Sequence, residues 1–314
     1  MTSDATPQHP LLATAAGMPH DPLWTRAGTV LRLAADGQRD ATIIGVPAHR
    51  TSISTTNAHT TPDVVREALL RYSAYNASAD IDLRDAVIVD AGDIDDPDTT
   101  EGEARTSQAV ADAIAHSTLT VALGGDNSVT FAAARGLAQV YGWESIGLVT
   151  IDAHHDVRDG VSNGSPVRRL VEAGLPGARI AQVGISDFAN SREYTLRAKE
   201  FGIHVIHRDE LRGRAMSDVM AAALAAVDAP FVFVDVDVDV CDRAVVPACP
   251  ASVPGGLTAD DLRQLVRAAA RDPRVRAIDF TEVDAEADAA DGRTVRLVAL
   301  CVLEALTAAV QRRS

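Results

Sequence analysis

Two short segments rich in carboxylates and imidazoles each follow a β-branched stretch of the chain. They are DAHHD (152–156) and DVDVD (235–239). Alternate side chains of an extended strand point to the same side. Each segment therefore offers three potential ligands on one side, provided that the chain stays extended. These six residues are Asp152, His154 and Asp156, and Asp235, Asp237 and Asp239.

The chemistry that these groups could do together is metal chemistry. If all the carboxylates were ionised and unpaired they would repel one another strongly, and divalent cations would remove that repulsion. Oxygen-rich sites with one or two imidazoles favour Mn²⁺ over Zn²⁺. Two such ions roughly 3.5–4 Å apart can hold a hydroxide, a strong nucleophile at neutral pH. One Asp-x-Asp alone is more often a strand end or a turn, but the two segments together predict a metal site.

Two further segments stand at the same kind of position. GGDNS (124–128) follows an apolar run, and Glu282 and Asp284 follow the last β-branched stretch. In an open parallel sheet, ligands bind outside the carboxyl ends of the strands. We therefore expect four strand ends to deliver these groups to one rim.

The elements that position these groups alternate along the chain. Strands followed by helices predict βαβ units, and hence an α/β fold with a mostly parallel sheet covered on both faces. Residues 1–40 show no clear period and are expected to form an irregular N-terminal arm before a single domain, 41–314. We expect strands at 41–46, 85–93, 119–125, 145–156, 179–185, 202–206, 230–238 and 275–283, and helices at 61–75, 104–117, 128–142, 258–272 and 293–313.

Composition excludes several classes of protein. The formal net charge is −15, so anionic partners such as nucleic acids and acidic membrane surfaces would be repelled. The three cysteines are widely spaced, which argues against a disulfide framework and fits a reducing cytoplasm. The sequence shows no signal peptide pattern and no apolar run long enough to suggest a membrane span. A protein that handles metal ions or a small-molecule substrate fits these totals.

The motifs, in their order, resemble those of the ureohydrolase (arginase/agmatinase) superfamily. GGDNS is similar to the family's Gly-Gly-Asp-His-Ser, and DAHHD matches its Asp-Ala-His-x-Asp. The similarity spans roughly 41–310. It implies a three-layer α/β/α fold, a pair of Mn²⁺ ions and a homo-oligomer, either a trimer or a hexamer. The remaining matches are DVDVCD (237–242), PGGLT (254–258) and TEV (281–283).

The resemblance also implies a role for each site residue. Asp152 and Asp237 would bridge the two ions. Asn127 and Asp156 would complete the first site, and His154 and Asp239 the second. Glu282 would bind the cationic amidine or guanidinium, and Asp156 would act as the proton carrier. Since Asn127 stands where the family has histidine, and a neutral amide is a weaker ligand than imidazole, the first ion should bind less tightly.

Within the superfamily, the segment 157–190 is most similar to formimidoylglutamases. Asn163-Gly164 replaces the His-Gly pair of arginases and agmatinases, and GISDFAN (184–190) approaches a stretch of formimidoylglutamases. Arg158, Asn163 and Arg168 are then expected to bind the substrate, the arginines through its two carboxylates. An equal alternative is that both arginines pair with local acids. Asp-Arg-Ala at 242–244, in place of Asp-Pro, is a further departure.

Three functions remain open at this point. The first is hydrolysis of N-formimidoyl-L-glutamate to L-glutamate and formamide, a step of histidine degradation. The second is a guanidino hydrolase, of the agmatinase or guanidinobutyrase kind, that releases urea. The third is a metal-poor, non-catalytic relative, which Asn127 motivates. Release of formamide or urea discriminates the first two, and the metal content discriminates the third.

Overall fold

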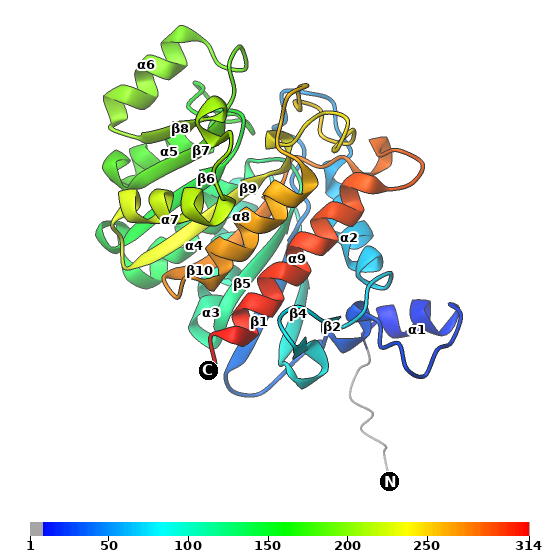
Figure 1. Cartoon of the computed structure of the whole chain (residues 1–314). Coiled ribbons are helices and arrows are strands. Elements are labelled where there is room, and N and C mark those ends of the chain that lie inside the picture. The colour runs from blue at the N-terminus through cyan, green and yellow to red at the C-terminus, as the bar shows by residue number, and fades with distance from the viewer. Residues whose placement is uncertain (1–8, 314) are drawn as a thin grey trace.

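The computed structural model describes residues 9–313 and is built around an eight-stranded sheet in the order β4-β1-β5-β10-β9-β6-β7-β8. Every pairing in this sheet is parallel (Figure 1). The predicted mostly parallel sheet is therefore confirmed. Its strands are β1 (Arg39–Val46), β4 (Ile88–Asp93), β5 (Ser117–Gly124), β6 (Ile146–Ile151), β7 (Ile180–Ile185), β8 (His204–His207), β9 (Phe231–Asp237) and β10 (Val275–Thr281). The hairpin β2 (Tyr75–Asn76) and β3 (Ile81–Asp82) lies apart from it.

Helices cover both faces of the sheet, which gives the expected three-layer α/β/α architecture (Figure 1). Helices α7 (Met216–Val227), α8 (Ala259–Arg271), α9 (Arg293–Gln311) and α2 (Thr61–Leu69) pack side by side on one face. The opposite face carries α3 (Thr100–His116), α4 (Val129–Tyr141) and α5 (Pro166–Ala173), and α6 (Arg192–Phe201) joins their hydrophobic cluster.

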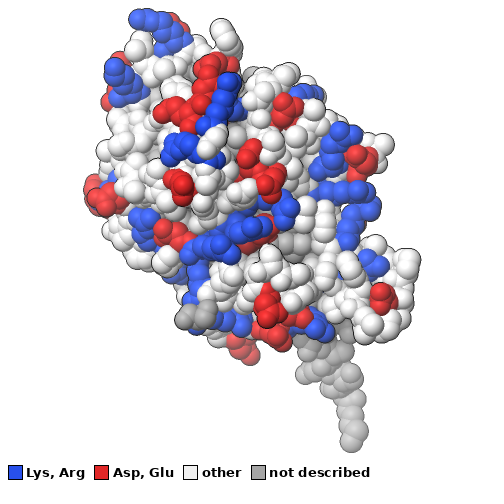
Figure 2. Space-filling view, in the orientation of Figure 1, with Lys and Arg blue, Asp and Glu red and all other residues white. Residues whose placement is uncertain are grey.

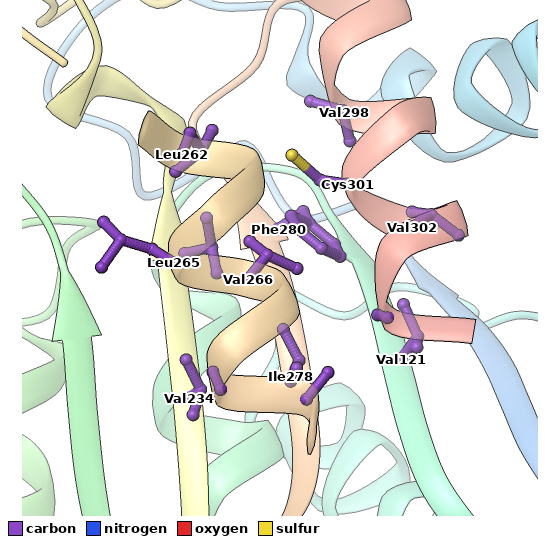
Figure 3. Packing of buried hydrophobic residues seen from close by; sticks show 14 of the residues in the cluster. Val121, Val234, Leu262, Leu265, Val266, Ile278, Phe280, Val298, Cys301 and Val302 are labelled. Carbon is purple, nitrogen blue, oxygen red and sulfur yellow. The ribbon is translucent and has the colours of Figure 1, made fainter. Parts of the chain in front are cut away.

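Successive side chains along a strand belong alternately to the two hydrophobic cores, one on each face of the sheet. In β5, Val121 belongs to the core under α8 and α9, whereas Ala122 belongs to the core under α3 and α4. This alternation is the period-two geometry of a strand. In Figure 3, side chains of α8 and α9 meet those of β5, β9 and β10. The strands that carry the site residues are therefore anchored on both faces.

After β1, three helices were not predicted from the sequence, although local signals mark two of them. Pro166 occupies the first turn of α5, and Gly174 ends that helix in a left-handed conformation. Ser191 caps α6 by accepting a hydrogen bond from the backbone N–H of Tyr194. The third is α7. The predicted helix at 61–75 is also shorter in the structure, since α2 ends at Leu69.

The segment before β1 contains ordered structure that the sequence did not indicate. Residues 11–16 form helix α1 (Leu11–Ala16), and a 3₁₀ turn follows at Ala27–Val30. His9 is buried and contacts Asp90 of β4 through its Nε2, at 2.9 Å from Oδ2. The first eight residues of the expected arm lie outside the described residues. The division into an arm and one domain stays a prediction.

Helix α9 is long and apolar enough to cross a membrane by length and composition, and it is the one such helix among residues 9–313. Yet 72% of its apolar window is buried inside the protein, as in the core helix of a globular fold. On the face formed by α8 and α9, acidic and basic side chains are interspersed (Figure 2).

Glu304 of α9 links this helix to α8, and its loss is expected to destabilise the fold. Its buried carboxylate accepts hydrogen bonds from Arg263, at 2.7 Å, and from Arg267, at 2.7 and 2.5 Å. Burial alone would raise the pKa of Glu304, but these bonds outweigh it and leave the pKa lowered. The carboxylate therefore adds stability above its unfolded pKa of 4.5, and that contribution disappears as the pH falls through the lowered folded pKa.

We expect Glu304→Gln to reduce the free energy of unfolding by about 1–3 kcal/mol at pH 7, measured by urea denaturation. The difference from the wild type should shrink as the pH falls below 4.5 and through the lowered folded pKa, where the wild-type carboxyl becomes neutral as well. The exposed Glu200→Gln serves as the control and should change little. A Glu304→Gln effect that is as large at low pH as at pH 7 would contradict the role given to the charge.

Candidate metal centre

The predicted ligands gather at the carboxyl ends of four strands that are neighbours in the sheet, in the order β5-β10-β9-β6. Asn127 follows β5 and Glu282 follows β10. Asp237 ends β9 and Asp152 begins the loop after β6. Because all four strands are parallel, their carboxyl ends lie at one edge of the sheet, where ligands bind in such folds.

Five of the predicted ligands form two groups in which the potential ligand atoms all lie within 4.8 Å of one another. One group consists of Asp152, His154 and Asp239, and the other of Asp152, Asp156 and Asp237. Asp152 belongs to both. The two groups therefore form adjoining sites that share one carboxylate, which is the arrangement that two neighbouring divalent ions require.

In the first group, His154 lies between two carboxylates. Its Nδ1 is 3.1 Å from Oδ2 of Asp239 and 3.5 Å from Oδ1 of Asp152. Burial would lower the pKa of His154, but Asp239 and Asp152 outweigh it and raise this pKa to about 12. In return, the imidazolium lowers the pKa of Asp239 against the effect of burial. Without a metal the imidazole is thus protonated, and a binding cation has to displace that proton.

In the second group, the carboxyl groups repel one another. Burial raises the pKa of Asp156 and of Asp237 well above 3.8, and the charge of Asp152 raises both further. Burial also raises the pKa of Asp152 to about 6. Among the described residues, Oδ2 of Asp152 and Oδ1 of Asp239 are buried without a hydrogen-bond partner. Buried oxygens without partners and an excess of carboxylates fit a divalent cation.

Asn127 faces the second group through its side-chain amide. Its Nδ2 donates a hydrogen bond to Oδ2 of Asp156 at 2.5 Å, and its Oδ1 accepts from the hydroxyls of Thr130 and Thr281. The hydroxyl of Thr130 has a second acceptor, Oδ2 of Asp279, at 2.9 Å. If the amide rotated by a half turn, its oxygen would face Asp156. The Thr130 hydroxyl would still have Asp279 as an acceptor.

Glu282 is held rigidly beside this cluster. Its backbone has a φ of 65°, in the left-handed region that residues other than glycine seldom adopt. Its Oε1 accepts hydrogen bonds from the backbone N–H of Asn127, at 2.8 Å, and from Nδ2 of Asn163, at 2.7 Å. Burial raises the pKa of Glu282 to about 8, with the charge of Asp126 adding to it. A cation bound nearby would stabilise the ionised form.

A cavity of about 330 Å³ opens onto the cluster. Arg158 and Asn163 line it together with Glu282 and four of the predicted ligands, whereas Arg168 does not; the four are His154, Asp156, Asp237 and Asp239. Arg168 instead donates from Nε to the carbonyl of Arg158 at 2.6 Å, and it also contacts the carbonyl of Gly160 and the carboxylate of Glu172. This differs from the predicted contact of Arg168 with a substrate carboxylate and corresponds to the alternative of local pairing.

The backbone of the two ligand segments differs in two places from the extended conformation expected from the sequence. Strand β6 ends at Ile151, and Asp156 has a left-handed φ of 53°, so the DAHHD segment is not extended. Asp239 lies in the 3₁₀ turn Val238–Val240 rather than in the strand. Asp235 belongs to neither group of ligands, and it is the cross-strand partner of Asp279 instead.

Other residues around the site were not singled out from the sequence. Tyr194 and Ile53 line the cavity. The backbone N–H of Ile53 donates to Oδ1 of Asn163 at 3.0 Å, which couples the loop at 47–60 to the Glu282 contact. Arg243, a departure from the family pattern, braces its loop through the carbonyls of Cys249 and Pro250.

Comparison with known proteins agrees with this geometry. Residues 39–308 match the model of the Arginase family. A formimidoylglutamase from Bacillus subtilis (strain 168) is 34% identical over 289 residues, which cover 86% of this chain and 88% of that protein. The crystal structure of formimidoylglutamase from the same species superposes with a TM-score of 0.86 at 31% identity, covering 95% of this chain and 96% of that one.

A relative with a different activity is more distant. An agmatinase from Pyrococcus horikoshii is 27% identical over 255 residues, which cover 79% of this chain and 84% of that protein. The family match spans the sheet, its helices and every predicted ligand. The chain therefore belongs to the arginase family.

Proposed function

We propose that this protein is a manganese-dependent hydrolase of linear amidines that converts N-formimidoyl-L-glutamate to L-glutamate and formamide. The observation that carries the proposal is the pair of ligand groups that share Asp152 and that lie beside a cavity lined by Glu282 and Arg158. This substrate requires a metal pair, a carboxylate that binds its amidine, and a cation that binds one of its carboxylates. The similarity to formimidoylglutamases over most of the chain supports it.

We propose that the six predicted ligands hold two Mn²⁺ ions. Asp152, which is common to both groups, would serve both ions, and the family resemblance gives Asp237 the same role. His154 and Asp239 complete one site, and Asp156 and Asn127 the other. Five oxygen ligands and one imidazole are a donor set that suits manganese. The ions, when bound, lower the pKa of a water molecule and so supply hydroxide at neutral pH.

The acidic residues of the cavity have separate tasks in this proposal. Glu282 accepts hydrogen bonds from the amidine N–H groups and holds the formimino carbon at the metal pair, because a carboxylate matches two such donors. The contacts from Asn127 and Asn163 fix the orientation of Glu282. Asp156 holds a proton and delivers it to the glutamate nitrogen as that nitrogen leaves.

The substrate carboxylates require a cationic partner in the cavity. Arg158 lines the cavity, and we propose that it binds one carboxylate of the substrate. Asn163 lies between Glu282 and the loop at 47–60, where it contacts both. We assign Arg168 a supporting task, since its guanidinium holds the carbonyls of Arg158 and Gly160.

A guanidino hydrolase that releases urea is the second candidate. The acidic cavity favours cationic substrates, and an agmatinase is among the relatives. Arg158 in the same cavity argues against a substrate whose far end is cationic, because like charges would meet there.

The proposal is tested by incubating manganese-loaded protein with N-formimidoyl-L-glutamate and, separately, with agmatine and guanidinobutyrate. We expect formamide and L-glutamate from the first substrate and little urea from the others. Urea release without formamide would support the guanidino hydrolase. Absence of both products, together with an absence of bound metal, would support the non-catalytic alternative.

Asn127 should control the retention of one ion. Imidazole is a stronger ligand for manganese than a neutral amide, so we expect Asn127→His to retain one ion more tightly. A change of about tenfold or more in its apparent dissociation constant is expected, the lower end of what groups around a metal contribute. Metal content per chain after graded dialysis measures this. Equal loss of both ions from the wild type and the variant would contradict the assignment.

The assembly and the location of the protein stay predictions. We propose a homo-oligomer, either a trimer or a hexamer by family analogy, and a cytoplasmic location. Light scattering of the purified protein measures the first directly.

A further inference from the structure

The ring of Tyr194, on helix α6, lies within reach of two arginine side chains. The Cζ atom of Arg158 is 5.5 Å from the ring centroid, and the Cζ atom of Arg197 is 5.7 Å from it. Both distances fall within the roughly 6 Å range of cation–π attraction. Tyr194 is half-buried and lines the same cavity as Arg158 and Glu282. An aromatic ring thus stands beside the guanidinium to which the proposed function gives a substrate carboxylate.

The backbone around Arg158 is fixed from two sides. Arg197 of α6 donates to the carbonyl of Val157 at 2.6 Å and pairs with Asp159 at 2.8 Å. The backbone N–H of Arg158 donates to the carbonyl of Gly164 at 2.9 Å, and its carbonyl accepts from Arg168. Gly164 also leaves room for this arginine, since a Cβ there would lie 2.6 Å from Cδ of Arg158. With its backbone held, Arg158 retains freedom mainly in its side chain.

The guanidinium of Arg158 has an unusual environment for an acidic protein. Within residues 9–313 no carboxylate pairs with it, although carboxylates pair with Arg168 and Arg197 nearby. A carboxylate partner would compete with an anionic substrate for the same N–H donors. A π face attracts the cation and leaves the edge of the guanidinium free to donate two parallel hydrogen bonds.

We propose that Tyr194 is a positioning residue that sets the preference of the cavity for anionic substrates, by holding the Arg158 guanidinium where it meets a substrate carboxylate. The inference rests on the proposed function and deepens it, because it concerns the same cavity. Helix α6 thereby contributes to specificity without contacting the reacting carbon. Tyr194 and Arg197 are one helical turn apart on α6. Tyr194 contacts the side chain of Arg158, and Arg197 holds the backbone of the same loop.

The test compares Tyr194→Leu, Tyr194→Phe and the control Leu196→Ala, which alters an exposed residue of α6 outside the cavity. For Tyr194→Leu we expect KM for N-formimidoyl-L-glutamate to rise about 3- to 10-fold, with kcat within about twofold of the wild type. Inhibition by the product L-glutamate should weaken by the same factor. Tyr194→Phe keeps the π face, so its KM and its inhibition by L-glutamate should match those of the wild type. Leu196→Ala should match the wild type.

A second substrate separates positioning from general damage. Hydrolysis of formamidine, an amidine without carboxylates, should be equally slow in the wild type and in Tyr194→Leu. Should leucine unfold α6, as judged by circular dichroism, Tyr194→Met offers a flexible apolar replacement for the same comparison. An unchanged KM in a folded variant, or an equal loss with both substrates, would overturn the inference. A wild type that releases no formamide would instead refute the proposed function.

Discussion

Replacing Asp152 with asparagine is expected to remove both metal ions and to lower kcat by more than about 100-fold. Mutation of a residue that only surrounds a metal costs about 10- to 100-fold in metal affinity or activity. A ligand common to both metal sites should exceed that range. The neutral amide keeps the shape of the side chain but loses the negative charge that offsets two cations. Metal content per chain after gel filtration and the rate of formamide release measure the two effects.

The stability of the metal-free variant separates loss of ligation from loss of folding. Asp152 is fully buried, and its charge raises the pKa values of Asp156 and Asp237. Removing this charge relieves repulsion, so metal-free Asp152→Asn should unfold at the same temperature as the metal-free wild type or a higher one. Asp209→Asn, at an exposed position, is the matched control and should retain both ions. Full metal content in Asp152→Asn would contradict the shared-ligand arrangement.

Replacing Glu282 with glutamine is expected to leave the metal content intact and to lower kcat/KM by about 10²–10³-fold. This is the usual loss when one preorganised electrostatic contact to the reacting group is removed. The amide still accepts from Asn127 and Asn163, so the local structure should persist. What it loses is the charge that holds a cationic amidine.

The contrast with Asp152→Asn makes the Glu282 prediction specific. Glu282→Gln should bind manganese like the wild type while binding substrate poorly, whereas Asp152→Asn should fail at the metal. Loss of metal from Glu282→Gln would make Glu282 a ligand and not an amidine contact. Activity near that of the wild type would remove it from the mechanism.

Much of the architecture could be predicted because periodicity reports burial. The strands next to the site are β-branched and buried on both faces, and each one was predicted to within a few residues, apart from the overextension after β6. Helices α6 and α7 were missed for different physical reasons. Helix α6 buries only Ala198, so it lacks a strong apolar stripe. Helix α7 is rich in alanine, which blurs the division between its faces.

The candidate site could be predicted as a set of residues but not as a geometry. The order of the motifs predicted Asn127, Asp156 and Glu282 as site residues, and these residues lie together in the structure. Asp152, His154 and Asp156 lie together as expected, although the segment is not extended, and both Asp156 and Glu282 adopt left-handed backbone conformations. Such conformations depend on tertiary contacts that spacing does not encode.

The environment of the arginines lay beyond the sequence for the same reason. Arg158 and Arg168 are the same type of residue, and both follow the DAHHD motif. Only the fold shows that the loop carbonyls engage Arg168, while Tyr194, from a helix some 35 residues further on, approaches Arg158. Contacts between residues far apart in sequence leave no local pattern to read.

The most direct test of the central claim is formamide release from N-formimidoyl-L-glutamate, measured as manganese is added back to metal-free protein. We expect no release without metal and a rate that reaches its plateau at about two ions per chain, with the second ion bound more weakly because of Asn127. Full activity in the metal-free protein, or no formamide at saturating manganese, would contradict it.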